Sequence, residues 1–130
     1  MLKSRMNIKK NFLISAFGIV LIIALLYGVN PQWFASTFLG ITQLDLNIAH
    51  ILRAVMGLYI ALGLFWLYAA FHAPYRAVAV LTTAIFAGGL VAGRILSLAL
   101  DGPPAPLLIF YIVAELALVP LAYWVFTRDD

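Results

Sequence analysis

Four stretches of the chain are almost continuously apolar, and polar or helix-breaking residues separate them. They cover residues 11–29, 48–71, 77–100 and 106–126. A helix needs about 20 largely apolar residues to cross a bilayer, so each stretch is long enough to span one. Proline in the second and third connections interrupts the helical pattern. Because short connections force neighbouring helices to run in opposite directions, the pattern predicts an all-α, integral membrane, antiparallel four-helix bundle.

The longest connection, residues 30–47, lies between the first two apolar stretches. Pro31 suits the first turn of a helix, and Trp33 and Phe34 lie among polar residues such as Gln32. This composition predicts a short amphipathic helix in the membrane interface, with Trp33 at headgroup depth. An ordinary anchoring loop and a lid over an intramembrane site are the two interpretations of its role.

Composition supports a membrane protein. Of the 130 residues, 65% are hydrophobic and 10% are charged, whereas a soluble domain carries about 25% charged residues. A soluble enzyme, a disordered chain and a nucleic-acid-binding domain are therefore excluded. The chain has no cysteine, which removes disulfides and thiolate metal sites. We expect one domain over residues 1–130, with no cofactor and no metal site, because the sequence lacks ligands at helical spacing.

Basic residues outside the apolar stretches predict the orientation. All of them fall on one side of a four-span topology: Lys3, Arg5, Lys9, Lys10, Arg76 and Arg128. The opposite side, residues 30–47 and 101–105, carries no lysine or arginine. The positive-inside rule then places both termini in the cytoplasm.

Three charged residues lie inside the apolar stretches, where charge is costly and usually faces the bundle interior. At 1.5 Å per residue, Arg53, Arg94 and Glu115 lie about 9, 10 and 13 Å from the outer ends of their helices. The sequence therefore predicts one charged layer in the outer half of the bundle. Two arginines and one glutamate leave that layer with a surplus positive charge.

Helical periodicity places these charges on faces that also carry small or polar residues. On the second apolar stretch this face contains Asn47, His50, Arg53, Ala54, Gly57 and Ala61. On the third it contains Gly89, Gly93, Arg94, Ser97 and Asp101, and on the fourth Tyr111, Glu115, Ala122 and Phe126. Small and polar residues favour helix–helix contact in lipid. We expect the three faces to converge, with the Gly89-x-x-x-Gly93 pattern packed inside the bundle rather than at a dimer interface.

Two segments on these faces carry a resemblance. HILRAVMGLY (residues 50–59) and GRILSLALDGP (residues 93–103), together with Glu115, resemble a family of small four-helix bacterial membrane proteins, domain-of-unknown-function family 4345. The likeness covers the chain from about Pro31 onward. It implies a bacterial inner-membrane protein with four spans, and it implies no activity.

The leading functional hypothesis is a non-enzymatic membrane protein with an outward-opening polar pocket for a small anionic or amphipathic ligand, such as a lipid headgroup. Its candidate residues, grouped by role, are Arg53 and Arg94 holding the anion, Glu115 orienting them, Asn47, His50 and Asp101 at the mouth, and Ser97 and Tyr111 on the same faces. Guanidinium groups suit carboxylate or phosphate. The alternative for the arginines is internal pairing with Glu115 and Asp101.

Two other functions stay open. In the first, the chain is an accessory subunit of a larger membrane complex, or a homo-oligomer, and its charged residues have a structural role. Alternatively, it is a small intramembrane enzyme or proton-coupled transporter that uses His50 and Glu115, since histidine titrates near neutral pH. The expected partners are membrane lipid, a small anionic ligand or other membrane subunits, and not nucleic acid.

Overall fold

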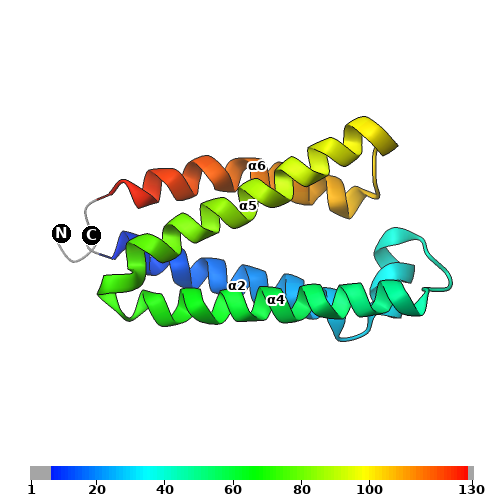
Figure 1. Cartoon of the computed structure of the whole chain (residues 1–130), viewed down its shortest axis with the longest axis horizontal. Coiled ribbons are helices and arrows are strands. Elements are labelled where there is room, and N and C mark those ends of the chain that lie inside the picture. The colour runs from blue at the N-terminus through cyan, green and yellow to red at the C-terminus, as the bar shows by residue number, and fades with distance from the viewer. Residues whose placement is uncertain (1–6, 129–130) are drawn as a thin grey trace.

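Four long helices make up the bundle in the computed structural model, which describes residues 7–128. They are α2 (Ile8–Gly28), α4 (Leu46–Ala70), α5 (Ala73–Asp101) and α6 (Pro106–Phe126). Each is long and apolar enough to cross a membrane, and residues 7–128 contain no β-strand. The predicted all-α bundle of four apolar helices is confirmed (Figure 1).

Proline begins two of these helices. Pro74 lies in the first turn of α5, and Pro106 is the first residue of α6. The first turn tolerates proline because its N–H groups have no partner within the helix. The sequence pattern places residues 72–76 in a break, so the predicted start of α5 at residue 77 is four residues late. The turn between α4 and α5 is consequently very short, with Phe71 and His72 between the helices.

The helices form two closely packed pairs, α2 with α4 and α5 with α6 (Figure 1). Helix α2 also contacts α5 across the bundle, whereas α2 and α6 touch sparsely. The two ends of the described chain lie at the same end of the bundle. There the Lys9 ammonium donates a hydrogen bond to the Arg128 carbonyl.

Glycine allows α2 and α4 to approach closely. A Cβ atom at Gly28 would lie 2.5 Å from Met56 Cβ, and one at Gly63 would lie 2.9 Å from Val20 Cγ1. By contrast, a Cβ at Gly89 or Gly93 would meet nothing within 4 Å. The prediction that Gly89-x-x-x-Gly93 packs inside the bundle is therefore wrong. Gly89 and Gly93 are both exposed, whereas Arg94 at the edge of the same face reaches α6.

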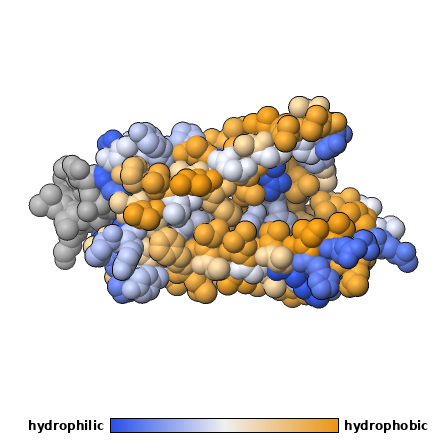
Figure 2. Space-filling view, viewed as in Figure 1, coloured by the Kyte–Doolittle hydropathy of each residue, from blue (hydrophilic) through white to orange (hydrophobic). Residues whose placement is uncertain are grey.

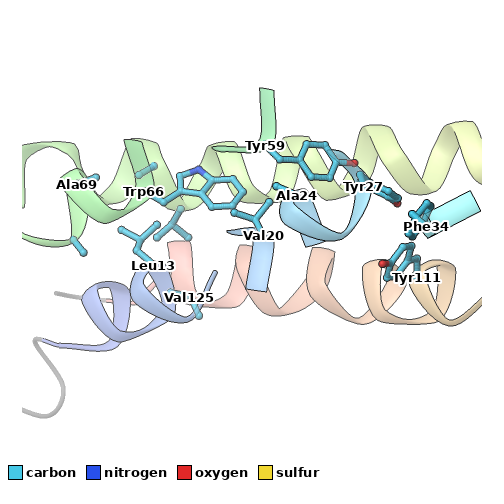
Figure 3. Close-up of a cluster of buried hydrophobic side chains, with 13 residues drawn as sticks. Leu13, Val20, Ala24, Tyr27, Phe34, Tyr59, Trp66, Ala69, Tyr111 and Val125 are labelled. Carbon is cyan, nitrogen blue, oxygen red and sulfur yellow. The ribbon is translucent and has the colours of Figure 1, made fainter. Parts of the chain in front are cut away.

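A line of buried side chains runs between the helices (Figure 3). Trp66 lies in the half nearer the termini, and its indole N–H donates to Thr82 Oγ1 at 3.0 Å. The ring of Phe86 packs edge-on against Trp66 at a centroid distance of 5.5 Å and against Tyr59 at 5.0 Å. The interior of the bundle is thus largely aromatic away from the termini.

The connection between α2 and α4 contains a short helix, as predicted from Pro31 and its neighbours. Helix α3 (Pro31–Phe34) begins at Asn30, whose side chain accepts a hydrogen bond from the Trp33 N–H, and continues into the π-helical turn η1 (Ala35–Leu39). Gly40, with φ of 73°, ends η1 in the left-handed conformation that favours glycine. The side chain of Gln32 then holds the loop by bonding the Thr42 carbonyl and the Leu44 N–H.

Phe34 anchors this segment in the bundle. Its side chain is 1% exposed, and its ring meets the Tyr27 ring edge-on at 4.8 Å. Trp33, on the same short helix, stays half exposed. The segment therefore packs on the end of the bundle beside Tyr27, with Phe34 buried together with Pro31 and Ala35.

Candidate functional site

An ion pair connects α5 and α6. Arg94 Nε donates to Glu115 Oε1 at 2.9 Å, and the two side chains are 19% and 14% exposed. The charge-assisted hydrogen bond pairs the two charges and joins α5 to α6. Of the two internal partners proposed for Arg94, the structure selects Glu115.

Three tyrosines, Tyr27, Tyr59 and Tyr111, lie together near this ion pair, and Figure 3 shows their rings. The Arg94 guanidinium carbon lies 5.4 Å from the centre of the Tyr111 ring, within range of a cation–π interaction. The Tyr27 ring lies 6.2 Å from Tyr111 and 6.0 Å from Tyr59. The sequence therefore brings one charge pair and three phenol rings together at the end of the core away from the termini.

A cavity of about 250 Å³ extends from this polar group along the bundle. Its floor is formed by α4 and α5, including Trp66 and Phe86, and its walls by α2 and α6. At one end it reaches Arg94, Glu115 and the three tyrosines, and toward the termini it reaches Phe12. Nearly all of the lining between these ends is apolar, so the cavity is an apolar channel with one polar end.

The cavity opens sideways between α2 and α6. Its lining includes four exposed residues, two on each of these helices: Ser15, Ile19, Ala114 and Leu121. Sparse contact between α2 and α6 leaves this seam open. On the face that Figure 2 shows, with α4 and α5 in front, the middle of the surface is hydrophobic and hydrophilic atoms appear in a hollow between the helix pairs.

Three of the residues singled out from the sequence line this cavity: Arg94, Glu115 and Tyr111. They come from the polar faces predicted on α5 and α6. On the α6 face, Tyr111 and Ala122 are buried and Glu115 is half-buried, so that face points inward as expected.

The second-helix face does not join them. All six of its residues are exposed: Asn47, His50, Arg53, Ala54, Gly57 and Ala61. Arg53 Nε instead donates to the Gly28 carbonyl at 3.3 Å, at the end of α2. The predicted convergence of three faces is therefore wrong for α4. The physical reason is that α4 packs through its opposite face, where Tyr59, Gly63 and Trp66 are buried.

The predicted outward mouth is also not formed by its expected residues. Ser97 and Asp101 are exposed on α5 and bond to each other, Oγ to Oδ2, at 3.0 Å. Neither lines the cavity, and neither does His50. Of the pair considered for proton transfer, His50 is exposed on α4 and Glu115 is bonded to Arg94. Across residues 7–128, no cluster of three carboxylate or histidine side chains could hold a metal ion.

Sequence reasoning missed Tyr27, Tyr59 and Trp66, which line the cavity. A signal was present, because tyrosine and tryptophan carry a polar group that needs a partner when it is buried. Tyr27 and Tyr59 each place such a hydroxyl group inside an apolar stretch, whereas charge alone does not identify them.

Comparison with known proteins gives one result. A family model described as "Domain of unknown function (DUF4345)" matches residues 8–126. No curated protein and no solved structure matches the chain.

Proposed function

The chain belongs to the DUF4345 family of domains of unknown function, and for this member we propose a non-enzymatic role in which it binds one amphipathic molecule. The hydrocarbon chain of that molecule occupies the cavity, and its polar end lies beside Arg94, Glu115 and Tyr111. The observation that carries the proposal is the apolar cavity with one polar end and a sideways opening between α2 and α6.

The size and shape of the cavity support a single chain. At about 250 Å³, it lies just below the roughly 300–1,000 Å³ of ordinary ligand pockets. Along α2 the lining runs from Phe12 to Tyr27, about 22 Å at 1.5 Å per residue. A long, narrow, apolar space of this kind fits one extended hydrocarbon chain better than a compact ligand or a whole two-chain lipid.

The sideways opening supports a ligand that comes from the membrane. Helices α2 and α6 both have the length and apolarity of membrane spans, so the seam between them faces hydrocarbon in a bilayer. A buried charge pair within such spans is costly and commonly marks a functional site. The ligand can thus enter from the bilayer without passing through water.

The charges at the cavity distinguish between the anionic and the amphipathic ligand considered from the sequence. Arg94 is neutralised by Glu115, and Arg53 is exposed outside the cavity. The surplus positive charge expected from the sequence is therefore absent from the cavity. An amphipathic ligand remains the better candidate, and a strongly anionic one loses its physical basis.

We place the protein in a bacterial inner membrane with both ends in the cytoplasm, and cysteine labelling tests this orientation. The chain has no cysteine of its own, so Ser36→Cys and Thr127→Cys introduce single sites at exposed positions at opposite ends of the bundle. A membrane-impermeant maleimide applied to intact spheroplasts should label Ser36→Cys, because η1 lies on the outer side. Thr127→Cys should react only after permeabilisation, and the reverse pattern would overturn the orientation.

Fluorescence of Trp66 tests occupation of the cavity. Trp66 lines the cavity and is 2% exposed, and the chain holds three tryptophans. In a Trp33→Phe/Trp124→Phe background, Trp66 is the remaining tryptophan. A fatty alcohol brominated midway along its chain should quench it saturably in detergent micelles, because bromine quenches at short range.

A matched pair of variants distinguishes the cavity from the general surface. Ala114 lines the opening on α6, and Ala117 is exposed on the same helix outside the cavity. Ala114→Phe should weaken the apparent affinity roughly tenfold or more, since overpacking a filled site costs about 1–3 kcal/mol. Ala117→Phe should leave it unchanged. Quenching that does not saturate, or that both variants alter equally, would show that the probe only dissolves around the protein.

A further inference from the structure

We infer that the polar end of the cavity recognises a neutral oxygen acceptor, a hydroxyl or carbonyl group at the end of the hydrocarbon chain, through the hydroxyl of Tyr111. This inference rests on the proposed function, because it concerns the head of the molecule whose chain fills the cavity. It assigns a specific hydrogen-bond donor and excludes the anionic headgroup that the sequence suggested.

The Tyr111 hydroxyl is the first observation. The residue is 7% exposed and lines the cavity. Among residues 7–128 its hydroxyl oxygen is the sole buried side-chain polar atom without a partner at normal hydrogen-bond geometry, and the Tyr27 hydroxyl is its polar neighbour. Buried polar atoms in proteins are almost always paired, so an exception calls for an explanation. A ligand oxygen at the polar end of the cavity supplies the missing partner.

The neighbouring charges are the second observation. Arg94 and Glu115 bond each other at 2.9 Å, so their charges cancel at the cavity wall. A carboxylate or phosphate placed there would lose its hydration without gaining a free counter-ion, and desolvating an unpaired charge is unfavourable. A neutral head avoids that penalty. The net charge of the site therefore selects against anions and cations alike.

The balance of donors and acceptors points to an acceptor on the ligand. The guanidinium of Arg94 has five N–H donors and no acceptor, and the Nε donor is the one bonded to Glu115. A tyrosine hydroxyl can also donate. The Arg94 guanidinium carbon lies 5.4 Å from the Tyr111 ring, so both donors border the same end of the cavity. An oxygen with lone pairs, in a hydroxyl or a carbonyl, complements them.

Competition against the brominated fatty alcohol tests this assignment in full-length protein with Trp66 as the reporter. The competitors share one chain length and differ at the head: an alkane, a fatty alcohol, a methyl ketone and a fatty acid carboxylate. The alcohol and the ketone should compete about threefold to tenfold better than the alkane, the range expected for one neutral hydrogen bond. The carboxylate should compete no better than the alkane. Comparing the fatty alcohol with the methyl ketone shows whether the site prefers a hydroxyl or a carbonyl oxygen.

Tyr111→Phe provides the decisive variant, and Tyr123→Phe is its matched control because Tyr123 is exposed on the same helix outside the cavity. Tyr111→Phe should abolish the preference of the alcohol and ketone over the alkane and should leave alkane binding intact. It should not lower the melting temperature of the ligand-free protein, because it removes a buried hydroxyl that lacks a partner at normal hydrogen-bond geometry among the described residues. Tyr123→Phe should change neither measurement.

The possible failures are distinguishable. Equal competition by all heads in the wild type, with Ala114→Phe still blocking them, would overturn the head assignment and leave the cavity proposal standing. A preference that survives in Tyr111→Phe would show that another group recognises the head. Best competition by the carboxylate would contradict the argument from cancelled charges. Absence of saturable quenching by any chain would overturn the proposed function itself.

Discussion

Glu115→Leu is expected to lower the free energy of unfolding by about 3–5 kcal/mol, because it leaves the charge of Arg94 buried without its partner. Arg94→Leu should cost a similar amount for the same reason. The bond between Arg94 Nε and Glu115 Oε1 is 2.9 Å long, and both side chains are mostly buried. Reversible unfolding in mixed micelles, followed by circular dichroism, measures the effect.

The double variant Arg94→Leu/Glu115→Leu provides the sharper readout. It removes both charges at once. Its loss in free energy of unfolding should therefore be smaller than the sum of the losses in the two single variants. Interaction energies of about 0.5–3 kcal/mol are typical of residues in direct contact. Asp101→Leu is the matched control, because Asp101 is exposed and bonds within its own helix to Ser97. Additive losses, or an equal loss in Asp101→Leu, would show that Arg94 and Glu115 are not coupled.

Phe34→Ala should produce the second large loss, about 3–5 kcal/mol, in the range measured for fully buried phenylalanines. Phe34 is 1% exposed and meets the Tyr27 ring at 4.8 Å, so its removal leaves a void between α3 and the end of the bundle. Phe110→Ala is the control at the same end of the molecule, because Phe110 is 63% exposed. Equal melting temperatures for the two variants would mean that α3 does not pack on the bundle as described.

The helices were predictable because one physical rule determines them. A span must be apolar over the thickness of the bilayer, so hydropathy alone located α2, α4, α5 and α6. Their ends were less predictable, since proline both breaks helices and begins them. Pro74 looked like a break, yet it occupies the first turn of α5. The polar partner of Arg94 was also foreseeable, because a carboxylate one helix away lies at similar depth.

The orientation of α4 was not predictable by the same reasoning. Ala54, Gly57 and Ala61 share a face with Arg53, and small residues in lipid favour helix contact. Each helix has two candidate packing faces, however, and α4 uses the one with Tyr59 and Trp66, which face α2 and α5. The bond from Arg53 to the Gly28 carbonyl joins residues that no local pattern relates. Periodicity shows which residues share a face and leaves open where that face points.

Photo-crosslinking locates the bound chain and tests the central proposal most directly. The probe is a fatty alcohol with a diazirine at the methyl end of its chain, added to wild-type protein in micelles. With its head at Arg94 and Tyr111, the chain end should lie near the termini and crosslink to cavity residues such as Phe12, Ala16 and Leu118. Crosslinks distributed over exposed residues outside the cavity, such as Leu58 and Ile85, with none in the cavity, would contradict the proposal.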